Sequence, residues 1–147
     1  MQSAITARRL KFHGVLLFLL GLLTGFVVPQ LANPRMGVSA HLEGVMNGTF
    51  LVVLGLIWHE LRLSARAMAA AFWLVLFAAY TNWIATLLSA AWGTGKLTPI
   101  GAGGRIGAPW QEAIVAVGLI SLSLAIVAGV GIVAYGLRGK SAADTLA

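Results

Sequence analysis

A histidine, a glutamate and an asparagine lie close together in the stretch SAHLEGVMNGTF, which runs from Ser39 to Phe50. His41 offers an imidazole that can bind a metal or a haem iron. Glu43 offers a carboxylate, and Asn47 offers an amide that both donates and accepts hydrogen bonds. The stretch leads directly into the apolar run FLVVLGLIW. Because polar groups in or beside a bilayer are costly, each of the three must find a protein or ligand partner.

The composition places most of this chain in lipid. It has 147 residues, of which 59% are hydrophobic and 10% charged, and its mean hydropathy is +0.91. A soluble domain usually carries about 25% charged residues. Four apolar runs, at about 10–31, 41–61, 67–91 and 110–137, are long enough to cross the hydrocarbon core as helices. We therefore predict an all-α fold, namely a polytopic membrane protein built as a four-transmembrane-helix bundle.

The rest of the composition limits the other classes of function. We expect one domain over residues 1–138 and a disordered tail over 139–147. The chain has no cysteine, which excludes disulfides, iron–sulfur clusters and a cysteine nucleophile. No basic patch interleaved with aromatic residues is present, so we expect membrane lipid and no nucleic acid as a partner.

The positions of the basic residues predict the topology. With four spans, the two termini and the middle loop share one side of the membrane. By the positive-inside rule, the side with more lysine and arginine is cytoplasmic. Both termini are therefore predicted to be cytoplasmic, in a bacterial-type inner (cytoplasmic) membrane, and the loops near 33–38 and 92–109 face outward. Seven basic residues lie on the cytoplasmic side and three on the other: Arg8, Arg9, Lys11, Arg62, Arg66, Arg138 and Lys140, against Arg35, Lys96 and Arg105.

The helical rise of about 1.5 Å per residue places several polar groups at one level. Asn47 lies about 9 Å deeper than His41, and Asn82 lies roughly 13 Å from the outer end of its span. The two asparagines should therefore have similar depths, with Thr86 one turn nearer the outside. His13 falls near the cytoplasmic end of the first span, where we expect a structural or supporting role. His13 and His41 are then too far apart to share one iron.

A strip of glycines shares the face of His41 and has two interpretations. Gly44, Gly48 and Gly55 fall within about 60° of the direction of His41 around the helix. Small residues at this spacing allow membrane helices to pack closely. Alternatively, the glycines clear space for a flat, bulky group held by the histidine, such as a haem between apolar walls. In that case Gly44 and Gly48 contact the cofactor.

The acidic and amide side chains of the outer half also have two interpretations each. Glu43 and Glu112 either cap the first turns of their helices or form hydrogen bonds that orient His41 or an arginine. Asn47 and Asn82 either pack against each other between helices or hold the oxygen or nitrogen of a small polar head group.

Three segments together resemble a known family. The segment AHLEGVMNG (40–48), preceded by HG (13–14) and followed by YTNW (80–83), resembles the hydroxylaminobenzene mutases. These are small four-span membrane proteins that are similar to styrene oxide isomerase. The resemblance covers nearly the whole chain and is most specific in the His-x5-Asn-Gly pattern within 40–48.

The resemblance implies a cofactor, an assembly and roles for particular residues. It implies haem b in a homotrimer, with ferric iron acting as a Lewis acid on a small aromatic substrate. His41 matches the axial ligand of the haem iron, and Asn47 and Asn82 match asparagines of the substrate site. The isomerase branch has a tyrosine where this chain has Thr86, which favours the mutase branch. Tyr80 lies about 200° from Asn82 around the helix and is not expected to replace that tyrosine.

The implied reaction rearranges an arylhydroxylamine of the hydroxylaminobenzene type to an ortho-aminophenol with no net redox change. Two alternatives stay open. One is an epoxide-to-aldehyde isomerase like styrene oxide isomerase, and the other is a b-type cytochrome subunit for electron transfer with two axial protein ligands. Trp83 either lines an aromatic pocket or faces lipid. The remaining candidates for the pocket wall or a supporting shell are Tyr80, Trp83, Thr86, Glu43 and His13.

Overall fold

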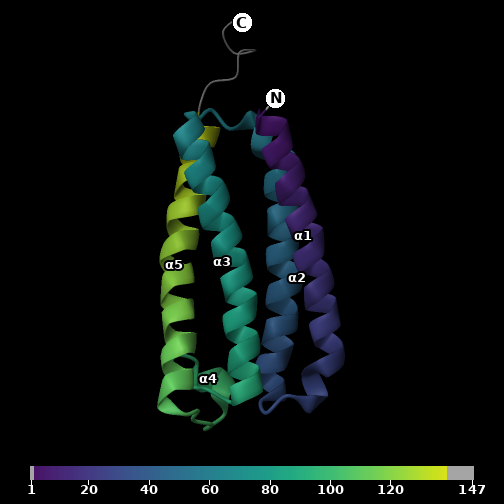
Figure 1. Cartoon of the computed structure of the whole chain (residues 1–147), viewed down its shortest axis with the longest axis vertical. Coiled ribbons are helices and arrows are strands. Elements are labelled where there is room, and N and C mark those ends of the chain that lie inside the picture. The colour runs from purple at the N-terminus through teal and green to yellow at the C-terminus, as the bar shows by residue number, and fades with distance from the viewer. Residues whose placement is uncertain (1, 139–147) are drawn as a thin grey trace, which may run out of the picture.

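Four long helices form the molecule in a computed structural model that describes residues 2–138 (Figure 1). The disordered tail predicted over 139–147 lies outside these residues. Within residues 2–138 there is no strand, and four helices are long and apolar enough to cross a membrane. This much of the predicted all-α, four-span fold is confirmed. The elements are α1 (Gln2–Val27), η1 (Val28–Gln30), α2 (Pro34–Ile57), η2 (Trp58–Glu60), α3 (Ala65–Trp92), α4 (Pro99–Ala102) and α5 (Pro109–Leu137).

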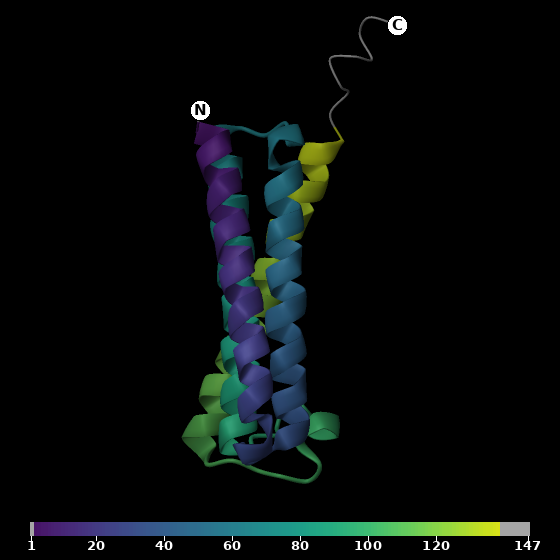
Figure 2. The same ribbon diagram turned by 90° about the vertical axis from the view of Figure 1, so that its right-hand side faces the viewer.

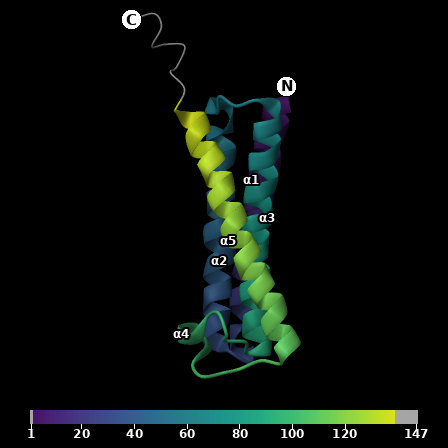
Figure 3. The same cartoon turned by 90° about the vertical axis from the view of Figure 1, so that its left-hand side faces the viewer.

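The helices pack as two pairs, α1 with α2 and α3 with α5, and α2 joins the pairs through α3. Helix α1 begins and α5 ends at the same end of the bundle (Figure 1). At the opposite end, the loop that contains α4 crosses the bundle beside the start of α2 (Figures 2 and 3). The structure therefore has an η2 end, where α1 begins, and an α4 end.

Helix α2 begins seven residues before the expected position, at Pro34 rather than residue 41. Asn33 is the N-cap, and its Oδ1 accepts a hydrogen bond from the backbone N–H of Met36 at 3.3 Å. Proline at the first helical position has a φ angle that already suits a helix. The expected outward loop at 33–38 is therefore wrong, because these residues form the N-cap and first turns of α2.

Helix α1 also begins early, at Gln2 rather than residue 10. The polar, alanine-containing segment SAITARR has good helix propensity, although its hydropathy is too low to mark a span. Helices α3 and α5 lie within two residues of the expected ranges 67–91 and 110–137.

The two ends of the bundle differ in what they bury. An apolar core that includes Leu10, Leu51 and the fully buried Trp58 lies toward the η2 end. Buried polar side chains lie instead in the half nearer the α4 end: Thr24, Asn33, Thr86, Ser89, Thr94 and Glu112. Buried polar groups need hydrogen-bond partners, so these residues mark the α4 half as the candidate region for a functional site.

Candidate functional site

The carboxylate of Glu43 joins the two predicted asparagines. Its Oε2 accepts a hydrogen bond from Nδ2 of Asn47, one turn later on α2, at 3.1 Å. The same oxygen accepts a hydrogen bond from Nδ2 of Asn82 on α3, at 2.5 Å. All three side chains are half-buried. The prediction that Asn47 and Asn82 lie at similar depths is therefore confirmed.

This arrangement fixes the orientation of both amides. A carboxylate only accepts hydrogen bonds, so each asparagine must turn its –NH2 group toward Glu43. The carbonyl oxygens then point away from the carboxylate, where each can accept a hydrogen bond from another group. Glu43 does not cap α2, because the helix begins nine residues earlier and its N-cap is Asn33. The capping interpretation of Glu43 is therefore wrong.

A groove of about 420 Å³ opens beside this cluster at the α4 end. Glu43, Asn82 and the buried Thr86 line it with polar atoms. Residues of the α4 segment and Leu119 of α5 supply much of the remaining wall, which is largely apolar. Its volume lies within the range of about 300–1,000 Å³ that is usual for small-molecule sites.

The imidazole of His41 is held in a defined orientation against α1. Its Nδ1 lies 2.8 Å from the backbone oxygen of Gly21. A carbonyl can only accept, so Nδ1 carries the proton and Nε2 keeps its lone pair, as in histidines that bind metals. A Cβ atom at Gly25 would lie 3.1 Å from Nδ1, which explains why a glycine stands beside the ring. Sequence reasoning had not singled out Gly21 or Gly25.

Gly44 and Gly48 serve the contact between α1 and α2. A Cβ atom at Gly48 would lie 2.5 Å from the backbone nitrogen of Phe18 and 2.7 Å from the oxygen of Gly14. A Cβ atom at Gly44 would meet the backbone of Gly21 and lie 3.1 Å from Cδ1 of Trp83. Close packing, one of the two interpretations of the strip, describes both glycines. Within one chain, α1 and Trp83 fill the space that was expected to hold a cofactor.

His41 and Glu43 lie on different sides of α2. Their two-residue spacing turns the side chains about 200° apart, and their partners are on α1 and α3 respectively. A single chain therefore does not bring the imidazole into the groove with Glu43 and Asn82, although the sequence had suggested one common site.

Three other predicted residues form hydrogen bonds between α1 and α3. His13 Nδ1 lies 3.2 Å from the hydroxyl of Tyr80, which also donates to the backbone oxygen of His13 at 3.3 Å. Because α1 begins at Gln2, His13 lies well inside the helix, and its place near the cytoplasmic end of the membrane span stays a prediction. Trp83 donates from Nε1 to Oγ1 of Thr24 at 3.0 Å, so its indole faces the helix seam.

Comparison with known proteins supports the family resemblance that the sequence suggested. A family model described as styrene oxide isomerase matches residues 6–138. The chain belongs to this family.

Two relatives of this chain carry a more specific name than the family does. One is hydroxylaminobenzene mutase HabB from Ectopseudomonas oleovorans, which is 51% identical over 141 residues, covering 95% of this chain and 86% of the relative. The other, hydroxylaminobenzene mutase HabA from the same organism, is 47% identical over 110 residues, covering 74% of this chain and 82% of the relative. No solved structure matches significantly. The predicted family and the enzyme class, an isomerase or mutase, are confirmed.

Glu112 holds the loop between α3 and α5, which contains α4 and covers the groove. Its Oε1 accepts the backbone N–H groups of Gly95 and Gly107, and its Oε2 accepts that of Lys96, each at 2.9 Å. The carboxylate lies in the first turn of α5, yet it binds the preceding loop rather than the end of its own helix. Asn33 adds a second fixed point, because its Nδ2 donates to the oxygen of Gly101 beside α4 at 3.0 Å. Sequence reasoning had missed Asn33.

Among residues 2–138, no group of three or more histidine, cysteine, aspartate or glutamate side chains is placed to bind a bare metal ion. A haem asks for less from the protein, since one axial histidine can hold its iron. The fixed tautomer of His41 fits that requirement.

Proposed function

We propose that this chain is a hydroxylaminobenzene mutase that rearranges an arylhydroxylamine to an ortho-aminophenol within a bacterial inner membrane. The observation that carries the proposal is the Glu43 carboxylate, which lines an apolar groove together with Asn82 and holds the amides of both Asn82 and Asn47. The names of the two relatives support the substrate class. In the reaction the N–O bond breaks, a C–O bond forms at the ortho carbon, and the proton lost from that carbon is balanced at nitrogen. Substrate and product are isomers, so no electrons are gained or lost.

The cluster suits the polar end of such a substrate. With its –NH2 group committed to Glu43, Asn82 in the groove wall has a carbonyl oxygen that can accept the N–H or O–H of a hydroxylamino group, and Asn47 supports Glu43 through its own amide. Positive charge develops on the nitrogen and ring as the N–O bond weakens. The negative charge of Glu43 favours that charge in a site where water is scarce.

The groove accounts for the ring of the substrate and for the exclusion of water. Its apolar wall can contact an aromatic ring, and Thr86 places a small side chain where the isomerase branch has a tyrosine. A cationic intermediate reacts readily with water, so a dry pocket limits the side reaction. Aromatic hydroxylamines partition into lipid, which explains why the enzyme is built in a membrane.

His41 is the residue that we propose as the axial ligand of haem b. Gly21 fixes its tautomer and leaves Nε2 as the donor atom. When bound at His41, ferric haem would supply a Lewis acid for the N–O bond of the substrate. Electron transfer by a bis-histidine haem is disfavoured. His13 is bonded to Tyr80 and lies about 12 Å along α1 from Gly21, and His59 lies at the other end of α2.

The homotrimer implied by the resemblance would also complete the site. In one chain His41 and the Glu43 cluster lie on different sides of α2, so neither alone combines ligand and substrate groups. Where the same chain surrounds a symmetry axis, His41 of one protomer and Glu43 of its neighbour can face the same space. The excess of basic residues at the η2 end supports cytoplasmic termini, and with that orientation we propose that the groove lies in the outer half of the membrane.

Product identification tests the reaction. Purified enzyme is incubated separately with hydroxylaminobenzene and with styrene oxide, and the products are separated by chromatography. The proposal expects ortho-aminophenol from the first compound and little or no aldehyde from the second. Conversion of styrene oxide alone would instead assign the chain to epoxide isomerisation, and rearrangement of neither compound by haem-loaded enzyme would refute the catalytic assignment.

An optical spectrum tests the cofactor. The parent protein is expected to show a Soret band that His41→Ala removes. The matched control is His59→Ala, because His59 is exposed at η2 and lies away from the groove. A colourless, iron-free parent, or equal loss of the band in both variants, would exclude the proposed ligand.

A further inference from the structure

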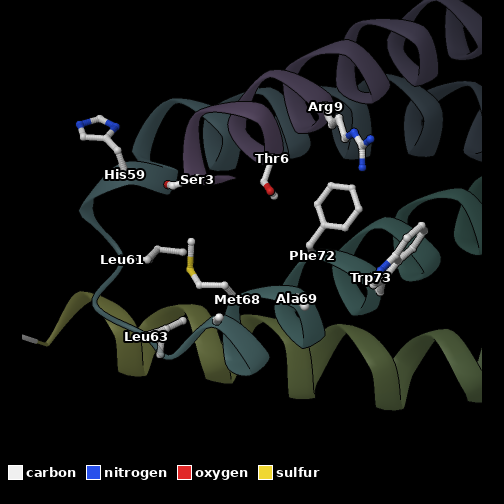
Figure 4. Close-up of a pocket in the computed structure, with 11 residues that line it drawn as sticks. Ser3, Thr6, Arg9, His59, Leu61, Leu63, Met68, Ala69, Phe72 and Trp73 are labelled. Atoms are coloured by element: carbon white, nitrogen blue, oxygen red, sulfur yellow. The ribbon is translucent and has the colours of Figure 1, made fainter. Parts of the chain in front are cut away.

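A second pocket, of about 520 Å³, opens at the η2 end, at the other end of the bundle from the Glu43 cluster (Figure 4). One wall comes from α1 and is polar, with Ser3, Thr6 and Arg9 spaced three residues apart. The facing wall comes from α3 and is apolar, including Phe72 and Trp73. Figure 4 shows Arg9 on α1 and the rings of Phe72 and Trp73 on α3 among the residues that line the pocket. The pocket is thus amphipathic across its width.

The surroundings of this pocket carry a strong excess of positive charge. Among the described residues of the η2 end, Glu60 is the only carboxylate. A pocket in such a field attracts an anion, and a guanidinium suits phosphate oxygens in particular because it presents a planar fork of donors. Six cations lie at this end: Arg8, Arg9, Lys11, Arg62, Arg66 and Arg138.

Apolar surface continues from the pocket along both helices. On α1, Phe12 follows Arg9 by three residues and is 64% exposed. On α3, Phe77 follows Trp73 by four residues, and these side chains are 48% and 63% exposed. Residues three and four apart share a helix face. A ligand whose charged group lay at Arg9 would therefore find an apolar track leading away from it.

We propose that this pocket binds an anionic phospholipid. The phosphate lies at the Arg9 guanidinium on the polar α1 wall, and the acyl chains follow the apolar track past Trp73. The positive charge suits the phosphate of such a lipid, and the aromatic wall and the apolar track suit its acyl chains. A zwitterionic lipid lacks the net charge, and a free phosphate lacks the chains. The site lies outside the reaction described above and stands independently of it.

A lipid-dependent thermal unfolding experiment on the full-length protein in detergent tests this site. The probes are phosphatidylglycerol, phosphatidylcholine of the same chain length and glycerol phosphate, each titrated separately. A ligand that binds only the folded state raises Tm with saturation. We expect a saturable rise with phosphatidylglycerol that exceeds the rise with either other probe. The Arg9→Gln variant should weaken the apparent affinity for phosphatidylglycerol about tenfold, because it removes charge-assisted hydrogen bonds.

Two further variants separate the pocket from the general charge of this end. Arg8→Gln removes the same charge one residue away, outside the pocket lining, and should retain the response. Ala69→Phe fills the pocket without changing any charge and should lose it. Equal loss in Arg8→Gln and Arg9→Gln, retention in Ala69→Phe, or an equal response to phosphatidylcholine would overturn the proposal. An equal response to glycerol phosphate would also overturn it, since that result describes a site for free anions.

Discussion

Replacing Glu43 by glutamine should slow the reaction by roughly 30-fold while leaving the fold intact. The parent carboxylate accepts two hydrogen bonds, from Asn47 at 3.1 Å and from Asn82 at 2.5 Å. A hydrogen bond to a charged group contributes about 1.5–3 kcal/mol, against about 0.5–1.5 kcal/mol for a neutral pair. The loss is therefore about 1 kcal/mol per bond, and about 2 kcal/mol in total. At roughly 1.4 kcal/mol per factor of ten, this corresponds to the stated decrease in kcat.

The assay follows ortho-aminophenol formation from hydroxylaminobenzene, with kcat and KM determined separately. Glu60→Gln is the matched control, because it makes the same chemical change at an exposed position of η2 and should keep the parent rate. The decisive measurement is a double-mutant cycle with Asn82→Ala. If Glu43 acts by orienting the amides, its substitution should cost much less when Asn82 is already absent. Parent-like kcat in Glu43→Gln, or losses that simply add, would refute this reasoning.

Four further outcomes are expected. Gly48→Ala should lower the free energy of unfolding by about 1–3 kcal/mol, because its Cβ meets the α1 backbone. Gly131→Ala, where a Cβ meets nothing within 4 Å, should be neutral or stabilising in the same denaturation assay. Glu112→Gln keeps an acceptor for two backbone N–H groups and loses the third, so trypsin should cleave the loop before α5 faster than in the parent; equal cleavage would argue against this anchor. Co-expression of inactive His41→Ala chains with weakened Asn82→Ala chains should raise the activity to about a quarter of the parent level if neighbouring protomers share a site, and to no more than the Asn82→Ala level if each chain is self-sufficient.

The depth of a polar residue could be predicted from the sequence, but its direction could not. Rise per residue alone was enough to bring Asn47 and Asn82 to one level. The partner that joins them, Glu43, required knowledge of how α2 and α3 are rotated against each other. The separation of His41 from Glu43 around α2 follows from their two-residue spacing, but which neighbouring helix each side chain faces depends on the same rotation. For His41, a partner on α1 could not be inferred, because it is a backbone oxygen that every residue carries.

Helix starts were hard to predict for a different reason. Hydropathy marks where a chain becomes apolar, whereas a helix begins where its first N–H groups find acceptors. Asn33 and Pro34 carry the stronger signal for α2, since an N-cap asparagine followed by proline is a typical helix start. The glycine strip was ambiguous because a missing side chain serves helix packing and ligand binding equally well. Only the neighbouring α1 backbone distinguishes these uses for Gly44 and Gly48.

The hydrogen bond from His41 to Gly21 makes the direction of His41 Nε2 depend on the register between α1 and α2. Sliding α1 along α2 by a single residue would carry that oxygen about 1.5 Å away and release the ring to rotate. Heating should therefore separate α1 from α2 and release the proposed haem in one step. Loss of the Soret band and loss of α1–α2 contact should then have the same midpoint temperature. Such a shift in register would leave the helices intact while removing the orientation of His41 on which the proposed haem site depends.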